Sequence, residues 1–392
     1  MNSEFDEIID RHNTFAIKTD LAVPRGKPAD ALPLWVADMD FRAPECIRRA
    51  LIARAQHGIW GYSRPDSSYY DAVQWWFKER HGWSTERGWI INTPGVVFAL
   101  ATAVRAFSKE GDGVMIQQPV YYPFSSVIAD NRRRIVSSPL AYDAATARYS
   151  IDFADFEKKI VLNGVRLFLL CSPHNPVGRV WTEAELRRMA EICLAHKVII
   201  VADEIHCDFV WDGHRHIPLA TLGAEIARHG IFCTAPSKTF NLAGLQISNI
   251  FIPNPALRNA FQTEFDRSGY CEPGADGLVA CRAGYSAEGA AWLAELQVYL
   301  KGNLDFLREY LRERLPEVRL VEPEGTYLAW LDFNGCGMNP SDLNDTIARK
   351  AKVWLDDGHM FGADGDGFQR INLCSPRSVI KEALDRIATA MA

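Results

Sequence analysis

Residues 165–178 read VRLFLLCSPHNPVG, in which an apolar run ends in a cluster of polar residues. The same layout recurs in KVIIVADEIH at 197–206 and in GIFCTAPSKT at 230–239. Such runs are typical of buried strands, and they cover Val165–Cys171, Lys197–Ala202 and Gly230–Thr234. Parallel strands that end together place the polar residues after them at one edge of the sheet, where ligands bind. The sequence therefore predicts a ligand site at that edge.

Three side chains from these clusters suit a pyridoxal phosphate site. Lys238 can hold the cofactor as a Schiff base, Asp203 can pair with its pyridinium nitrogen, and Asn175 can donate amide hydrogens to its phenolate oxygen. Taken singly, each has an ordinary alternative, namely a solvated surface lysine, a helix-capping Asp and an Asn-Pro turn. Their order and shared placement favour the cofactor site.

A glycine turn earlier in the chain offers a place for the phosphate. Trp89–Asn92 is expected to be a strand, and the turn that ends at Gly95 leads into a helix that begins with Val96 and Val97. Free N–H groups and the positive dipole end at a helix N-terminus attract an anion, and the hydroxyl of Ser237 can join them. A plain strand-to-helix turn remains the alternative on this segment alone.

Three further residues are candidates for the same site. Tyr121 follows an expected strand at Val114–Gln118, so its ring can stack on a pyridine ring or pack in the core. His206 can support Asp203 or reach the phenolate oxygen, or can be structural. Arg370 lies on an expected strand among apolar neighbours, where its fork suits a substrate α-carboxylate; a salt bridge is the alternative.

Composition limits the class of protein. The chain has 392 residues, 48% hydrophobic and 23% charged, with a net charge of −6 and no basic stripe, which argues against a nucleic-acid partner. No apolar run approaches the roughly 20 residues of a membrane span, and the acidic N-terminus lacks the charged-then-apolar layout expected of a signal peptide. The nine cysteines show no metal-ligand spacing, so no metal is expected. A soluble cytoplasmic protein fits best.

The elements suggest three parts: an N-terminal arm at 1–45 that packs with the small domain, a large α/β cofactor domain at 46–285, and a small α+β domain at 286–392. The arm is expected to be extended, and the large domain is expected to have a mostly parallel sheet with helices on both faces. Helices are expected at Glu45–His57, Ser67–His81, Thr182–His196, Gly289–Leu315, Asn339–Lys350 and Ser378–Met391. Two further strands are expected at Thr326–Phe333 and Phe368–Leu373.

With these residues identified, the chain resembles the fold-type I pyridoxal-phosphate enzymes related to class I and II aminotransferases. It is most similar to the MalY/PatB branch of carbon–sulfur lyases, which includes cystathionine β-lyases and cystalysin. The matching segments run nearly from end to end: 35–41 (WVADMDF), 62–63 (YS), 119–124 (PVYYPF), 174–178 (HNPVG), 203–206 (DEIH), 236–245 (PSKTFNLAGL), 325–330 (GTYLAW), 353–358 (VWLDDG) and 370–372 (RIN).

The resemblance implies a role for each candidate. It implies that Lys238, Tyr121 and Asp203 are catalytic and that Arg370, Ala37 and Trp35 bind substrate. It also implies that the cofactor is bound by Gly95, Val96, Val97, Tyr121, Asn175, Asp203, His206, Ser237 and Lys238. Finally, it implies that Tyr62 reaches the phosphate in the neighbouring subunit of a homodimer.

The expected reaction is α,β-elimination of a sulfur-bearing L-amino acid to pyruvate, ammonia and a thiol, with Lys238 as base and Tyr121 as proton donor to the leaving sulfur. An aminotransferase is the nearest alternative, and a lyase with an added regulatory protein-binding role is another. His206 and Gln246 stand where many aminotransferases have a Tyr and a phosphate-binding Arg. Both departures favour the lyase branch. Cystathionine, cysteine and cysteine S-conjugates are all admissible substrates.

Overall fold

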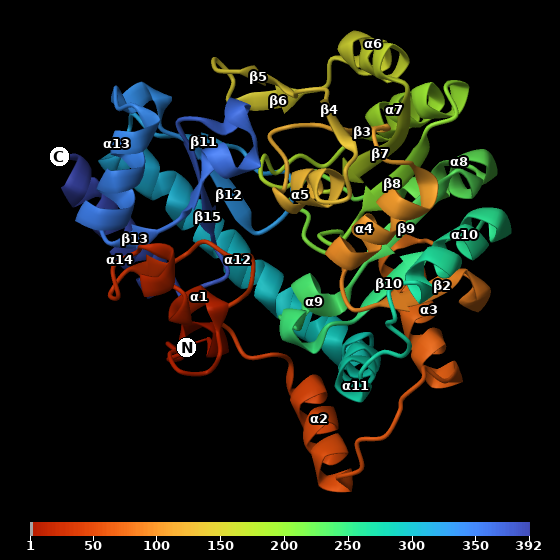
Figure 1. Ribbon diagram of the computed structural model, residues 1–392. Coiled ribbons are helices and arrows are strands. Elements are labelled where there is room, and N and C mark those ends of the chain that lie inside the picture. The colour runs from red at the N-terminus through yellow and green to blue at the C-terminus, as the bar shows by residue number, and fades with distance from the viewer. Residues whose placement is uncertain (1–2) are drawn as a thin grey trace.

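The computed structural model describes residues 3–392, so Met1 and Asn2 of the expected arm lie outside the described residues. A seven-stranded sheet forms the centre of the molecule (Figure 1). Its strands, in spatial order, are β2 (Ile90–Thr93), β10 (Ser248–Phe251), β9 (Gly230–Thr234), β8 (Ile199–Asp203), β7 (Val165–Cys171), β3 (Gly113–Ile116) and β4 (Arg134–Ser137). Strands from β9 to β4 are parallel, whereas β10 is antiparallel to both neighbours. The expected mostly parallel sheet is confirmed.

Strand β7 shows why the central strands of this sheet are mostly apolar. Its Leu167 and Leu169 pack in a core shared with α4, α5 and α10, whereas Phe168 and Leu170 pack in the core shared with α3, α6, α7 and α12. Successive side chains of a strand point to opposite faces, so a strand covered on both faces needs apolar residues at every position. The covering helices are α3 (Ser67–His81), α4 (Val96–Phe107), α5 (Pro123–Ala129), α6 (Phe153–Asn163), α7 (Glu183–Ala195), α10 (Pro255–Asp266) and α12 (Ala287–Arg314).

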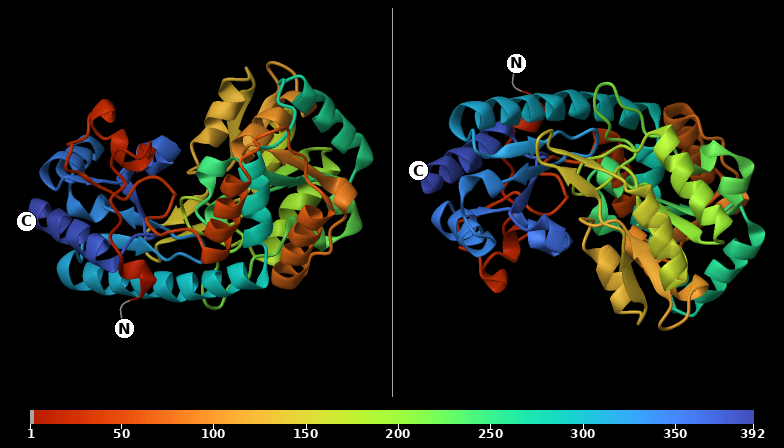
Figure 2. Two further views of the ribbon diagram at one scale, coloured as in Figure 1. Left: turned by 90° about the horizontal axis from the view of Figure 1, so that it is seen from below. Right: turned by 90° about the horizontal axis from the view of Figure 1, so that it is seen from above.

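A second, antiparallel sheet of four strands forms the C-terminal part of the molecule. Helix α12 runs along one side of the molecule from the large sheet to this smaller one in both views of Figure 2. The elements of this part are β11 (Arg319–Val321), β12 (Leu328–Asp332), β14 (Asp356–Asp357), β15 (Phe368–Asn372), α13 (Pro340–Asp345) and α14 (Arg377–Met391). The domain boundaries at 45/46 and 285/286 stay a prediction.

The shorter elements lie outside the two main sheets. They are β5 (Ala141–Asp143), β6 (Arg148–Ser150), α8 (Ala224–Arg228), α9 (Pro236–Thr239) and α11 (Ala275–Gly284). Among the helices of residues 3–392, none combines the length and the apolar character that crossing a membrane requires.

The N-terminal arm is less extended than expected. It forms the short helix α1 (Ile17–Asp20) and two 3-10 turns before β1 (Leu32–Pro33), which pairs in parallel with β13 (Val353–Trp354). Pairing with β13 attaches the arm to the C-terminal part. Helix α2 (Glu45–His57) then packs against α11 at the lower end of the molecule in Figure 1, and a loop returns the chain to α3.

Helices α2 and α3 have the expected bounds because local signals end them. The side chain of Asp66 accepts a hydrogen bond from Tyr69 N at 3.0 Å and caps α3. Gly58 and Gly82 follow the two helices with φ of 73° and 65°, a left-handed conformation that glycine adopts without a steric penalty. The start of α3 and the ends of α2 and α3 are therefore set by residues next to them in the sequence.

Other bounds differ from the prediction. The strand expected at Lys197–Ala202 begins only at Ile199, because Lys197 has a φ of 57° and belongs to the turn after α7. The helix expected at Asn339–Lys350 is α13 followed by a π-helical segment, Thr346–Lys350. Strand β10 was not predicted, since its sequence, SNIF, is short and half polar.

Candidate active site

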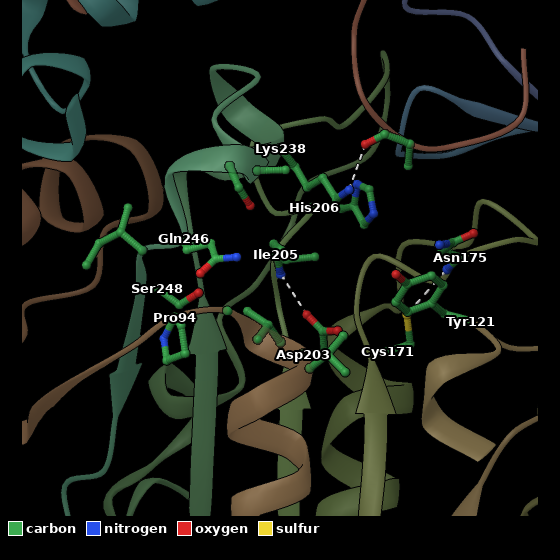
Figure 3. Close-up of a pocket in the computed structure, with 17 residues that line it drawn as sticks. Pro94, Tyr121, Cys171, Asn175, Asp203, Ile205, His206, Lys238, Gln246 and Ser248 are labelled. Carbon is green, nitrogen blue, oxygen red and sulfur yellow. Dashed lines mark hydrogen bonds between the residues drawn. The ribbon is translucent and has the colours of Figure 1, made fainter. Parts of the chain in front are cut away.

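A pocket lies at the carboxyl ends of β7, β8 and β9, at the edge of the sheet that the sequence indicates (Figure 3). Its walls are Ala37, Pro94, Gly95, Val96, Val97, Tyr121, Cys171, Asn175, Asp203, Ile205, His206, Ser237, Lys238, Ala243, Gln246, Ile247 and Ser248. Every expected site residue lies in this wall except Tyr62, Trp35 and Arg370. The shared edge of the parallel strands therefore brings together residues from distant parts of the chain.

Lys238 enters the pocket from α9, the short helix that follows β9 (Figure 3). Its Nζ donates a hydrogen bond to the carbonyl oxygen of Ala37 at 2.6 Å. Desolvation lowers the pKa of the Lys238 amine to about 8, although the nearby charge of Asp38 opposes this shift. An amine with such a pKa is partly neutral near neutral pH, and the neutral form is the nucleophile and the base.

Asp203 is the last residue of β8, and its carboxyl group is buried in the pocket wall. Oδ1 accepts a hydrogen bond from Ile205 N at 3.1 Å. Burial raises the pKa of Asp203 to about 7, because one N–H donor and the distant charge of Lys238 compensate the desolvation only in part. Among residues 3–392, no cationic side chain forms an ion pair with it. A protonated ring nitrogen in the pocket is the kind of partner that this carboxylate lacks.

Asn175 is oriented by Arg370. Arg370 Nη1 donates to Asn175 Oδ1 at 2.8 Å, and since a guanidinium can only donate, this contact identifies the amide oxygen. The amide NH₂ group of Asn175 is therefore the end left to donate into the pocket. Arg370 itself lies on β15 just behind the pocket wall, and its side chain is buried.

Two other groups hold the guanidinium of Arg370. Nη2 donates to the carbonyl oxygen of Trp35 at 3.0 Å and forms a buried ion pair with Asp356 on β14. The salt bridge considered as an alternative for Arg370 is thus present. It does not use the whole guanidinium, because Nε is buried without a hydrogen-bond partner.

Tyr121 and His206 are both enclosed and both neutral. Desolvation raises the pKa of the Tyr121 hydroxyl, so this group stays protonated and can donate a proton or a hydrogen bond. Desolvation, followed by the charges of Lys238 and Arg370, lowers the pKa of His206, whose Nδ1 is buried without a partner. A buried, unpaired nitrogen beside an open pocket is suited to a bound polar group.

The side of the pocket opposite Tyr121 and Asn175 carries Pro94, Gln246 and Ser248 (Figure 3). Helix α4 begins here after Gly95, and no side chain caps its N-terminus. The hydroxyl of Ser248 is buried without a hydrogen-bond partner. These neutral donors and the helix dipole suit an anion such as a phosphate. Among the described wall residues, Lys238 is the only one with a cationic side chain of Lys or Arg type.

Trp35 and Tyr62 lie outside the pocket wall. The indole ring of Trp35 is buried and stacks on Trp354 with 4.3 Å between ring centroids, so Trp35 contributes to the site through its carbonyl group. Tyr62 lies on the loop after α2, and its side chain is fully exposed. Within this chain Tyr62 contributes to a different surface hollow, with Arg54, Ser63 and Arg282 among its neighbours.

A family model described as aminotransferase class I and II matches residues 29–387. The chain belongs to this family. It is 42% identical over 387 residues to cystathionine β-lyase PatB of Bacillus subtilis (strain 168), with 99% of each chain covered. It is 33% identical over 391 residues to protein MalY of Escherichia coli (strain K12), covering 99% of this chain and 98% of MalY. The crystal structure of cystalysin from Treponema denticola, which contains a pyridoxal 5'-phosphate cofactor, superposes with a TM-score of 0.95 at 37% identity, covering 100% of this chain and 99% of that one.

The family assignment does not by itself identify all the wall residues. In the sequence Cys171 is a member of an apolar run, and Ile205, Ala243 and Ile247 carry no chemical signal. Ser248 was missed because it begins β10, the unpredicted strand. The one signal in the sequence is its position two residues after Gln246, which stands where many aminotransferases have a phosphate-binding arginine.

Proposed function

We propose that this chain is a pyridoxal-phosphate-dependent carbon–sulfur β-lyase, which converts a sulfur-bearing L-amino acid to pyruvate, ammonia and a thiol. The observation that carries the proposal is the convergence of Lys238, Asp203 and Asn175 on one pocket. The near full-length similarity to cystathionine β-lyase PatB supports the reaction class.

The residues of the pocket fit the cofactor. Lys238 would attach it covalently, Asp203 would pair with its ring nitrogen and the NH₂ group of Asn175 would donate to its phenolate oxygen. The phosphate would meet the uncapped start of α4 and two hydroxyl groups, those of Ser237 and of Ser248, whose Oγ is buried without a partner. When bound, the cofactor takes up the electron pair that remains at the substrate Cα after deprotonation.

Each step of the elimination has a residue to perform it. The unpartnered Nε of Arg370 offers a donor to the substrate α-carboxylate, which would orient Cα toward Lys238. The neutral amine of Lys238 takes the Cα proton. The bond between Cβ and sulfur then breaks, and the sulfur leaves with a proton from Tyr121, whose raised pKa keeps it protonated. The released aminoacrylate takes up one water to give pyruvate and ammonia.

The proposal includes a homodimer in which Tyr62 completes the site of the neighbouring subunit. Its support is the exposure of Ile52, Ile59, Trp60 and Tyr62 on α2 and the following loop, a cluster that a second copy could cover. The cytoplasmic location remains a prediction of the sequence.

Mixed dimers test the place of Tyr62. A mixture of equal amounts of Lys238→Ala and Tyr62→Ala chains, each nearly inactive alone, should recover about a quarter of wild-type activity, because half of the dimers then contain one intact site. Absence of recovery, with mixed dimers demonstrated by mass, would place Tyr62 in its own subunit's site or in neither.

The aminotransferase alternative uses the same pocket, and its products differ. With L-cystathionine as substrate, the lyase releases pyruvate and ammonia continuously. An aminotransferase instead converts the cofactor to pyridoxamine phosphate and releases a keto acid that retains sulfur. Detection of the second pair, with no pyruvate, would overturn the proposed reaction.

A further inference from the structure

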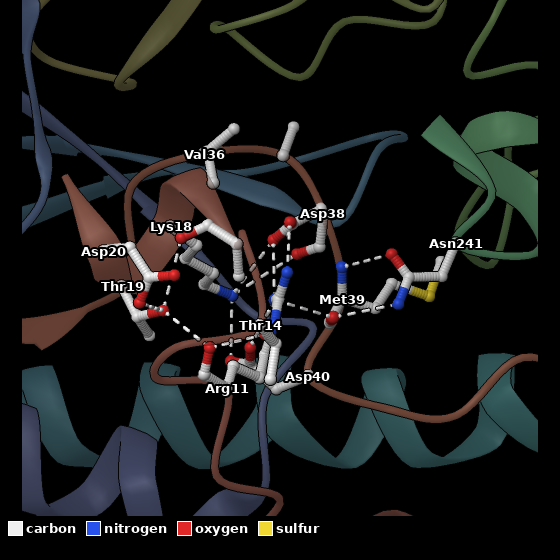
Figure 4. A network of polar contacts seen from close by, with 12 residues as sticks. Arg11, Thr14, Lys18, Thr19, Asp20, Val36, Asp38, Met39, Asp40 and Asn241 are labelled. Carbon is white, nitrogen blue, oxygen red and sulfur yellow. Dashed lines mark hydrogen bonds and ion pairs between the residues drawn. The ribbon is translucent and has the colours of Figure 1, made fainter. Parts of the chain in front are cut away.

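Residues 35–41, which we name the strap, pass between the N-terminal arm, Lys238 and the small sheet (Figure 4). The side-chain amide of Asn372, on β15, donates to the carbonyl oxygens of Val36 and Asp38 at 2.7 and 2.6 Å. On the other side, the side chain of Asn241 binds the amide and carbonyl groups of Met39 at 3.0 and 2.9 Å. Asn241 lies three residues after Lys238 in the sequence.

At the centre of the strap, the carbonyl oxygen of Ala37 accepts two hydrogen bonds. One comes from the Lys238 amine at 2.6 Å and the other from the Tyr327 hydroxyl at 3.1 Å. Ala37 also forms part of the pocket wall. The position of this carbonyl therefore determines where the free amine of Lys238 rests.

Two cations of the arm hold the strap through its two acidic side chains, Asp38 and Asp40 (Figure 4). Arg11 binds Asp38 with both terminal nitrogens, at 3.1 and 2.7 Å, and also donates to Asp40 at 2.9 Å and to the carbonyl oxygen of Met39 at 3.1 Å. Lys18 binds Asp40 at 2.8 Å and lies 3.5 Å from Asp38.

The burial of this network makes it rigid. The side chain of Lys18 is fully buried, and those of Arg11, Asp38 and Asp40 are about four-fifths buried. Charged groups in such surroundings remain paired, since separating them leaves a charge with neither water nor a partner. The network thus ties the arm, which precedes Lys238 by more than 200 residues, to the residue that contacts its amine.

We infer that Arg11 and Lys18 are positioning residues for the base of the reaction: they hold the strap so that the Ala37 carbonyl accepts one N–H of the Lys238 amine and directs its lone pair toward the substrate Cα. A neutral amine has two N–H bonds and one lone pair. Fixing one N–H on a carbonyl limits rotation about the bond between Cε and Nζ.

The test uses Arg11→Lys, which keeps the charge but cannot reach Asp38, Asp40 and Met39 together with one ammonium group. Arg42→Gln is the matched control. Arg42 also belongs to the N-terminal part of the chain, but it lies outside residues 35–41, and its ion pair with Glu7 is about half exposed. Three quantities are measured for each: amide hydrogen exchange of residues 35–41, the rate at which cofactor-free protein takes up pyridoxal phosphate, and kcat and KM with L-cystathionine.

In Arg11→Lys we expect faster exchange confined to the strap, and roughly ten- to hundredfold losses in the uptake rate and in kcat, since a small misplacement of a reacting group has effects of this size. KM should change less than kcat, because Arg370, the residue proposed to bind the substrate carboxylate, keeps its ion pair with Asp356. Arg42→Gln should match the wild type in all three measurements.

Two results overturn the inference. One is faster exchange of the strap with wild-type uptake and kcat, and the other is slow uptake and low kcat with a wild-type strap. If Arg11→Lys does not fold, Asp40→Asn, which weakens both anchors, is measured in the same way and has to show the same pattern. The inference rests on the proposed function only through kcat. If the wild type releases no pyruvate, that function fails, while exchange and uptake still decide the role of the strap.

Discussion

Replacing Asp203 by asparagine in the cofactor-free protein is expected to change how its stability depends on pH. Burial raises the pKa of Asp203 from 3.8 to about 7 in the folded protein. The folded state therefore retains a proton that the unfolded state loses, and the free energy of unfolding decreases as the pH rises from about 4 to about 7. A gap of about three pKa units corresponds to about 4 kcal/mol at pH 8, as an order of magnitude.

Asparagine does not ionise, so this loss should be absent from Asp203→Asn. Urea unfolding of both cofactor-free proteins at pH 4 and pH 8 gives the free energy of unfolding at each pH. Subtracting the values of the wild type from those of the variant cancels the contribution of all other titrating groups. The two should be similar at pH 4, where Asp203 is neutral, and the variant should be the more stable at pH 8. Addition of pyridoxal phosphate should stabilise the wild type more than the variant, because the cofactor's ring nitrogen pairs with the carboxylate.

Asp208→Asn is the matched control with the opposite sign. Asp208 is also buried, but hydrogen bonds from His81, Arg80, Thr239 and Trp76 surround its carboxylate. Burial alone would raise the pKa of Asp208, but the His81 hydrogen bond and nearby positive charges hold it at about 2. This pairing stabilises the fold above pH 4 and is lost as the pH falls through 2, so the substitution should destabilise the protein at pH 8 by about 2 kcal/mol or more.

If Asp203→Asn is no more stable than the wild type at pH 8, or if it keeps the wild-type change between pH 4 and pH 8, then Asp203 is not an uncompensated buried carboxylate. Wild-type pyruvate release by the cofactor-loaded variant would show separately that Asp203 is a structural residue. We expect that release to fall by several orders of magnitude, while the substrate amine and carboxylate still bind.

Lys238→Ala should remove the visible absorbance of the purified protein and nearly all turnover; full activity in this variant would exclude the cofactor assignment. Arg370→Ala is made together with Asp356→Asn so that no buried carboxylate is left without a partner. This double variant should keep its cofactor but have a higher KM, because it loses substrate-binding free energy on the order of 2–5 kcal/mol. Loss of cofactor at normal KM would contradict the role of Arg370. Tyr121→Phe should lower kcat most for substrates whose leaving thiol has a high pKa, because such thiols need a proton to leave; an equal loss for all leaving groups would assign Tyr121 a role in binding only.

Much of the fold followed from short-range features of the chain. The apolar runs that became β7 and β9 were recognisable because a strand covered on both faces is apolar at most positions. The bounds of α3 followed from Asp66 and Gly82, which act on their immediate neighbours. The positions of Asp203, Asn175 and Lys238 in one pocket followed from a single rule, that parallel strands end at the same edge.

Tertiary structure decided the remaining features. β10 is a strand because β2 and β9 pair with it on both sides, and nothing in its four residues indicates this. The ion pair of Arg370 with Asp356 depends on the register of β14 against β15. The strap is held against Lys238 by arm residues more than 200 positions away, so its geometry exists only once the whole chain has packed. Capping and periodicity depend on neighbours along the chain, whereas these contacts depend on the free energy of the complete fold.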